Sequence, residues 1–136
     1  MFKQLKNNFF QAAFGSLIWI TFLCSITDFF SRVPFSYIWH LIGIGVLMGL
    51  VFGVIYPYLW NHSTLKASTN IIICTLVNTL CGYAGIYLYS TQMFALIRPF
   101  AIGVLVLTLI LHIIAFYFYS KYDNKKMAAS LNQLNR

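Results

Sequence analysis

Four long apolar segments, separated by short polar breaks, dominate the pattern along this chain. They cover residues 9–30, 36–59, 67–89 and 99–120. Each is close to the ~20 residues that an α-helix needs to cross a ~30 Å hydrocarbon layer. Pro34 and Pro99 stand at two of the breaks, where a proline favours the start of a new helix. The pattern predicts four transmembrane helices, and the short connections predict antiparallel neighbours in one all-α bundle over residues 1–136.

The composition strengthens this reading. Hydrophobic residues make up 60% of the chain and charged residues only 8%. A soluble domain of this length needs more polar surface than that. We therefore expect a multi-pass membrane protein.

The positions of the basic residues predict the orientation. Arg32 and Arg98 lie on one side of the four segments, and the other Lys and Arg residues lie on the opposite side: Lys3, Lys6, Lys66, Lys121, Lys125, Lys126 and Arg136. Because loops rich in Lys and Arg stay in the cytoplasm, both termini are expected there, with residues 121–136 as a cytoplasmic tail. The lysines would then face anionic lipid headgroups.

Glycines interrupt the second apolar segment at a helical spacing. Gly45, Gly49 and Gly53 recur every four residues, so they form one stripe where another backbone can come close. Gly82 and Gly85 offer a similar shallow surface on the third segment. Two interpretations stay open, namely packing inside one bundle, which we favour, and a homodimer seam along the second helix.

Candidate catalytic chemistry is scarce. Asp28 and Asp123 are the only acidic residues; Asp28 is expected to pair with Arg32 one turn later, and Asp123 to balance the lysines around it. A contact of the Asp28–Arg32 pair with a substrate or peptide is the alternative. The sequence has no paired cysteines at metal spacing and no phosphate-binding or nucleophile motif. We expect no enzyme activity, no cofactor and no metal.

The histidines and cysteines are best explained by helix packing. His40, His62 and His112 are predicted at different depths, which argues against a shared metal site. His112 falls inside the fourth segment and needs a hydrogen-bond partner, for which the candidates are Thr75, Asn78 and Thr79. A proton or ligand role for His112 is the alternative. Cys24, Cys74 and Cys81 are expected to be small packing residues.

The cytoplasmic side offers the best candidate for binding. The tail can continue as a helix with Met127, Leu131 and Leu134 on one face, and Phe2, Leu5 and Phe9 form a similar ridge before the first segment. These ridges can lie on lipid headgroups or dock a cytoplasmic protein. The predicted partner contacts lie in the inner loop and the tail: Trp60, His62, Lys66, Lys125, Lys126, Leu131 and Leu134.

Two stretches carry a family resemblance. The loop "LWNHSTLKAST" and the ending "IIAFYFYSKYDNKKMAASLNQLN", in a four-span layout, resemble the small bacterial membrane family labelled domain of unknown function 3021. Members of that family are often encoded beside a LytTR-type DNA-binding regulator. The resemblance implies a multi-pass protein of the bacterial cytoplasmic (inner) membrane that belongs to a LytTR regulatory system, binds its partner transcription regulator and inhibits it.

Two hypotheses of different classes follow. In the first, which we favour, the protein sequesters a cytoplasmic LytTR-type regulator at the membrane without contacting nucleic acid itself. In the second, it is a small transport protein or an immunity protein against a membrane-active peptide. Polar residues inside the spans, Thr75, Asn78, Thr79, Thr108 and His112, would line the path that this alternative needs.

Overall fold

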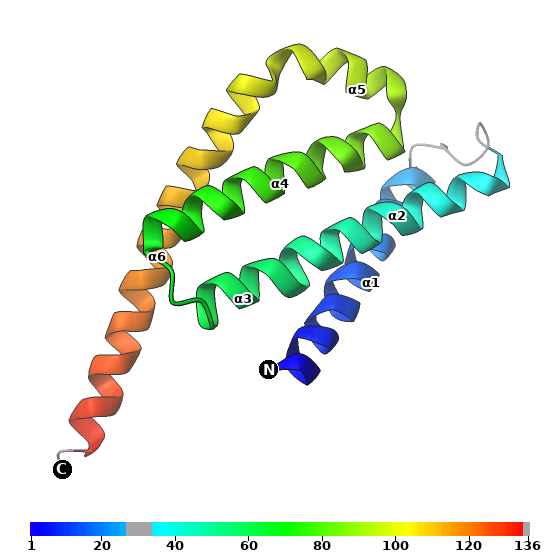
Figure 1. Cartoon of the computed structure of the whole chain (residues 1–136). Helices are drawn as coiled ribbons and strands as arrows, with labels where there is room; N and C mark the ends of the chain where they lie inside the picture. The colour runs from blue at the N-terminus through cyan, green and yellow to red at the C-terminus, as the bar shows by residue number, and fades with distance from the viewer. Residues whose placement is uncertain (27–33, 135–136) are drawn as a thin grey trace.

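The structure is a computed structural model that describes residues 1–26 and 34–134, and this part of the chain is helical without any strand. Its elements follow one another with short connections (Figure 1): α1 (Phe2–Ile26), the 3-10 turn η2 (Phe35–Tyr37), α2 (Ile38–Met48), the π-helix η3 (Gly49–Ile55), α3 (Tyr56–Asn61), α4 (Ala67–Tyr89), α5 (Thr91–Ile97), the 3-10 turn η4 (Arg98–Phe100) and α6 (Ala101–Leu134).

Four helical stretches are long and apolar enough to cross a membrane. They are Phe2–Ile26, Phe35–Asn61, Ala67–Tyr89 and Thr91–Ser130. The prediction of an all-helical chain with four membrane-length helices is confirmed. Large apolar side chains face outward along these helices, for example Phe14, Trp19 and Ile102. In water such a surface would be unfavourable, whereas lipid covers it at no cost.

Some boundaries differ from the sequence prediction. α1 begins at Phe2 instead of residue 9, and α6 begins at Ala101 and continues through the tail to Leu134, as the sequence allows. The stretch 91–97, expected as a connection, forms the short helix α5. The predicted Asp28–Arg32 pair and the end of the first predicted segment lie outside the described residues.

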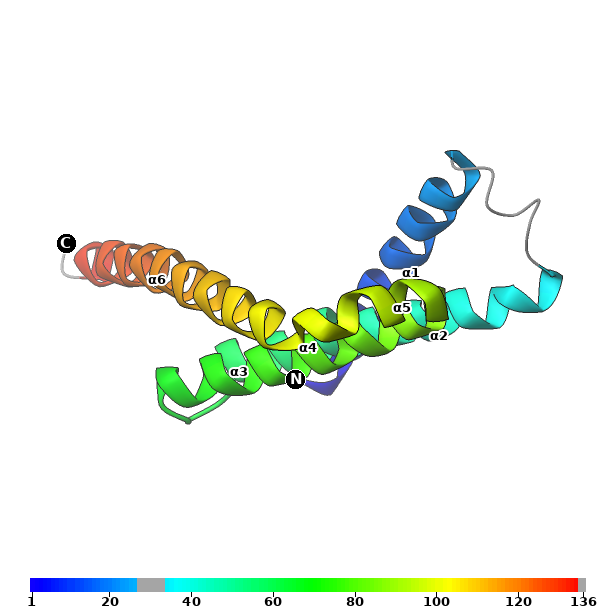
Figure 2. The same ribbon diagram turned by 90° about the horizontal axis from the view of Figure 1, so that it is seen from above.

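The helices pack in chain order. α1 lies against α2 and η3, α4 lies against α2 on one side and α6 on the other, and α5 folds back on α4. As expected, consecutive long helices are neighbours. The assembly is open, since α1 and α6 lie at its two edges and both leave the plane of α2 and α4 (Figure 2). The buried apolar core is correspondingly thin: Leu5, Cys24, Leu41, Ile44, Val51, Leu59 and Cys74.

The glycine stripe of the second span faces α1 of the same chain. A Cβ at Gly45 would lie 2.6 Å from Cγ of Leu17, and one at Gly53 would lie 2.5 Å from Cα of Phe9. Only hydrogen atoms fit there, so the glycines let the two backbones approach each other. The stripe lies under α1 and is not open to a second copy in this arrangement.

The two glycines predicted on the third span behave differently from each other. A Cβ at Gly85 would meet Met48 and Ile44 at ordinary contact distances of 3.7 and 4.0 Å, so α2 packs on this position. At Gly82 nothing lies within 4 Å. The expected close helix contact at Gly82 is therefore not formed by the described residues.

A π-helix interrupts the second span just before Pro57. Proline has no N–H, so in a regular α-helix the carbonyl of Gly53 would lose its partner. An i→i+5 register offers that carbonyl the N–H of Tyr58 instead. The N–H of Tyr56 already follows this register, since it donates to the carbonyl of Val51. The wider turn lets α2 and η3 face α1 while α3 turns toward α4 and α6.

Candidate binding surface at the lysine-rich end

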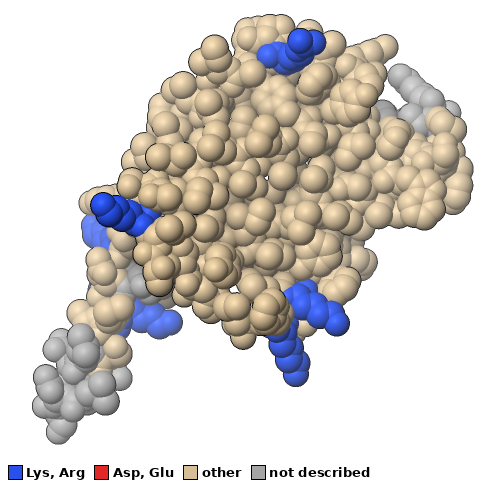
Figure 3. Space-filling view, viewed as in Figure 1, with Lys and Arg blue, Asp and Glu red and all other residues tan. Residues whose placement is uncertain are grey.

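One end of the molecule carries both termini and most of the basic side chains. We call it the lysine-rich end and define it by six exposed residues: Lys3, Lys6, Lys66, Lys121, Lys125 and Lys126. They come from the start of α1, the connection before α4 and the C-terminal part of α6. Figure 3 shows basic side chains along the lower and left edges, over these elements, and a separate basic group at the top. Arg98 belongs to η4, which follows the opposite end of α4.

Trp60 ties three helices together near this end. Its Nε1–H donates to Sγ of Cys74 on α4 over 3.3 Å. Its ring meets Tyr119 of α6 edge-on at 4.9 Å between centroids and lies 5.6 Å from Phe116. Beside it, the hydroxyl of Tyr119 donates to Oδ1 of Asn61 over 3.0 Å. Trp60 is half-buried and packs between helices, and its predicted role as a partner contact stays a prediction.

His112 lies deeper in the same contact between α3 and α6. Its Nδ1 lies 2.8 Å from the carbonyl of Thr108, which can only accept, so Nδ1 carries the proton. Nε2 then accepts from the hydroxyl of Tyr56. His112 is buried, and both ring nitrogens are satisfied. We call Tyr56, Trp60, His112, Phe116 and Tyr119 the aromatic seam.

The predicted partners of His112 were wrong. Thr75 bonds within its own helix, to the carbonyl of Ile71 over 2.8 Å, and the buried hydroxyl of Thr79 finds no partner among the described residues. The π-helix explains the error, because it rotates Tyr56 toward α6. A regular α-helix would point Tyr56 in a different direction, so the sequence pattern did not predict this contact.

The connection before α4 is braced by side-chain hydrogen bonds. Nδ2 of Asn70 donates to the carbonyl of Leu59 over 2.8 Å, and the hydroxyl of Ser63 donates to Oδ1 of Asn70 over 3.3 Å. The same hydroxyl oxygen accepts from the N–H of Leu65 over 3.1 Å. His62 and Lys66 stay exposed beside this bracing. The loop therefore presents two polar side chains from a fixed backbone.

The other predicted contacts lie on α6. Lys125 and Lys126 are exposed on the last third of α6, so both side chains are accessible to a partner. The side chains of Leu131, Leu134 and Asp123 lie outside the part of the chain that is described. The second predicted ridge, at the start of α1, is not free, because Leu5 is buried and Phe9 packs under Gly49 and Gly53.

Sequence reasoning missed most of the aromatic seam. His112, Phe116 and Tyr119 are spaced by four and three residues, and Tyr56 and Trp60 by four, so each set shares one helix face. That spacing was a readable signal for a contact face. The pairing of the two faces across 56 or more residues had no signal in a single sequence.

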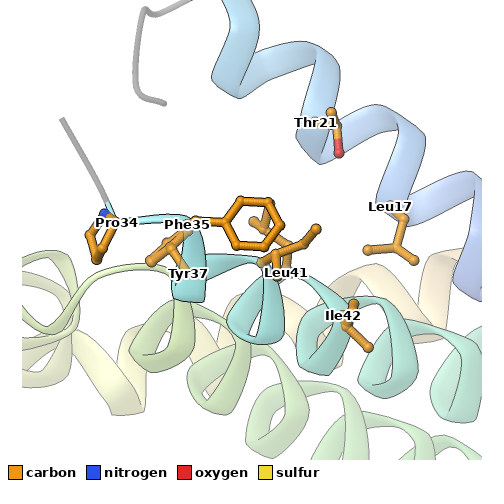
Figure 4. Close-up of a pocket in the computed structure, with 8 residues that line it drawn as sticks. Leu17, Thr21, Pro34, Phe35, Tyr37, Leu41 and Ile42 are labelled. Carbon is orange, nitrogen blue, oxygen red and sulfur yellow. The ribbon is translucent and has the colours of Figure 1, made fainter. Parts of the chain in front are cut away.

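The opposite end has an apolar groove where α1 and α2 diverge. It has a volume of about 590 Å³. Leu17 and Thr21 project into it from α1 and face Phe35 and Leu41 (Figure 4). Carbon atoms line nearly all of it, which suits a lipid chain more than covalent chemistry. Within residues 1–26 and 34–134 there is also no group of three His, Cys, Asp or Glu side chains that could hold a metal.

Comparison with protein-family models, curated proteins and solved structures finds no match to this chain. The resemblance drawn from the loop and the C-terminal stretch therefore stays a prediction.

Proposed function

We propose that this protein is a multi-pass membrane protein whose lysine-rich end binds a cytoplasmic DNA-binding regulator of the LytTR type and holds it at the bacterial cytoplasmic membrane. Sequestration of this kind needs no catalysis by the membrane protein. It needs a membrane anchor, an accessible surface on the cytoplasmic side and a way to change that surface.

The length of α6 is the observation that supports this proposal best. The helix has 34 residues, which is roughly 50 Å at 1.5 Å per residue, against a hydrocarbon layer of ~30 Å. Its last seam residue is Tyr119. Every described side chain from Lys121 to Ser130 is exposed. We call residues 121–134 the α6 extension.

Charge and shape make the α6 extension suitable for docking a protein. Lys121, Lys125 and Lys126 form a basic surface on it, and Met127 adds a flexible apolar side chain that is 56% exposed. Methionine adapts to irregular apolar surfaces, and lysines steer an acidic partner toward them. The braced loop with His62 and Lys66 adds a second contact point at the same end.

The aromatic seam supplies a route for release. It connects α3, which precedes the loop, with the part of α6 directly before the extension. If a signal changes the packing of these helices, the extension and the loop move relative to each other. A regulator that binds only one arrangement is then released to its promoters.

The experiment uses the full chain, produced in a bacterial host together with a LytTR-type regulator, and the proposal predicts that such a regulator is encoded beside its gene. We expect a fluorescent fusion of the regulator at the membrane when the full chain is present and throughout the cytoplasm when residues 121–136 are deleted. Expression from the regulator's promoter should rise several-fold in the deletion strain. Immunoblots of membrane fractions check that the shortened chain is inserted.

A matched pair of variants tests the site. Lys125→Gln with Lys126→Gln should release the regulator, whereas Lys3→Gln with Lys6→Gln removes the same charge from the same end and should leave it bound. Equal effects of the two variants would reduce the contact to general electrostatics and contradict the docking site. A regulator that stays cytoplasmic with the full chain would contradict the function itself, and altered sensitivity to a membrane-active peptide would then favour the immunity class.

A further inference from the structure

A second apolar groove lies under the arch that α5 and η4 form between α4 and α6. It has a volume of about 450 Å³. Figure 1 shows the arch at the top, with α4 and the start of α6 separated below it and coming together toward the left. The residues that define this arch groove come from all three parts: Leu80, Tyr83, Phe94, Arg98, Ile102 and Leu105.

Contacts between α5 and α4 hold the arch groove open. The ring of Phe94 meets Tyr83 and Tyr87 edge-on, at 6.1 and 5.4 Å between centroids. The hydroxyl of Tyr83 donates to the carbonyl of Ile97 over 3.3 Å. These contacts fix the point where the chain turns into α6. The first turns of α6 are thereby kept away from α4, so that the two helices form separate walls.

The walls of the arch groove are apolar and unfilled. Leu80 on α4 is 69% exposed and Ile102 on α6 is 79% exposed. In a protein surrounded by lipid, such side chains contact acyl chains, and a groove between two helices gives a chain contacts on both sides. A lipid chain lying there would touch more protein atoms than one beside a single helix.

The mouth of the arch groove carries a positive charge. Arg98 is exposed and lines the groove, and it forms no ion pair within residues 1–26 and 34–134. Its guanidinium has a planar set of donors that matches a phosphate group. The six lysines of the lysine-rich end lie at the other end of the molecule, so they cannot serve a headgroup bound here.

We propose that the arch groove binds one anionic phospholipid, with its phosphate on Arg98 and one acyl chain between α4 and α6. The apolar walls select the chain, and the guanidinium selects a negatively charged headgroup. This site depends on the membrane placement of the helices but not on regulator binding, so either proposal can fail alone.

Native mass spectrometry of the purified full chain tests the proposal, with phosphatidylglycerol or phosphatidylcholine of identical acyl chains added in detergent. We expect one phosphatidylglycerol to be retained about tenfold more strongly than phosphatidylcholine, as charge-assisted hydrogen bonds allow. Arg98→Gln should abolish this preference. Lys121→Gln with Lys125→Gln should leave it unchanged, since those lysines lie at the other end.

Filling the groove tests the place of the acyl chain. Ile102→Trp should lower retention of both lipids, and Leu80→Trp is a second variant from the other wall in case the first does not fold. Leu96→Trp is the matched control, because Leu96 is 72% exposed on α5 and does not line the groove. Unchanged retention in Arg98→Gln, or equal losses in the groove and control variants, would overturn the proposal.

Discussion

Gly53 is the residue at which the smallest change has the largest expected effect. A Cβ there would lie 2.6 Å from the carbonyl oxygen of Asn8 and 2.5 Å from Cα of Phe9. Backbone atoms cannot move aside as a flexible side chain can. We therefore expect Gly53→Ala to destabilise the chain by about 1–3 kcal/mol, the usual range for overpacking. Tryptophan fluorescence during unfolding by SDS in mixed micelles measures this.

Gly103 provides the control for that substitution. It also lies in a membrane-length helix, but nothing lies within 4 Å of its Cβ position. Gly103→Ala should leave the unfolding midpoint unchanged or raise it slightly, because alanine is the better helix former. If the two alanine variants unfold alike, the close approach of α1 to η3 is contradicted.

Single residues also show where sequence reasoning stops. The stripe of Gly45, Gly49 and Gly53 could be read from spacing alone, because a period of four fixes one helix face. Which helix covers that face could not be read, since both α1 and a second copy satisfied the pattern. His112 could be recognised as needing a partner, but its partner Tyr56 depends on the direction that η3 gives to α3.

At the scale of the elements, the spans were predictable because their polar boundaries are sharp. The third prediction, 67–89, coincides with α4. The first span begins earlier than its apolar segment, because α1 continues through the polar residues around Lys3 and Lys6 and buries Leu5. α5 was missed because its seven residues are held by Phe94 against Tyr83 and Tyr87, which are contacts that no local pattern encodes.

η3 is the element most sensitive to one substitution. Pro57→Ala restores a donor for the carbonyl of Gly53 and thereby permits a regular α-helix. The π-helical turn holds one residue more than an α-helical turn. A change to the regular α-helix would therefore rotate α3 about its axis by roughly 100° and move its side chains away from α6. We expect the contact between Asn61 and Tyr119 to weaken.

Crosslinking with a bifunctional thiol reagent measures that rotation. Cysteines placed at 61 and 119, in a background without the native cysteines, should be joined readily by a bifunctional maleimide that spans the length of the tyrosine it replaces when Pro57 is present, and several-fold less in Pro57→Ala. Pro99→Ala is the matched control, because Pro99 lies in η4, away from any π-helix. Equal crosslinking in both proline variants would mean that contacts around α3, and not Pro57, set the π-helical register.

At the scale of the whole molecule, the unequal distribution of charge predicts the orientation. The described residues carry six lysines at the lysine-rich end and Arg98 at the opposite end. In a bacterial cytoplasmic membrane this difference predicts that the lysine-rich end lies inside the cell. A membrane-impermeant maleimide on intact cells should therefore label Arg98→Cys and leave Lys66→Cys unlabelled, with the native cysteines replaced in both. Inside-out vesicles should give the reverse pattern.

This orientation separates the two proposals. If Lys66→Cys is labelled on intact cells, the α6 extension lies outside and cannot reach a cytoplasmic regulator, so the proposed function is lost. The arch groove would survive that result, because Arg98 would then face the inner leaflet, which also contains anionic phospholipid. If the labelling is as expected, Arg98 faces the outer leaflet, and the regulator-binding end and the lipid site lie on opposite sides of the membrane, joined by α6. A lipid bound under the arch could then influence the α6 extension only through α6 itself. The aromatic seam, which holds α6 against α3, would fix the tilt of α6.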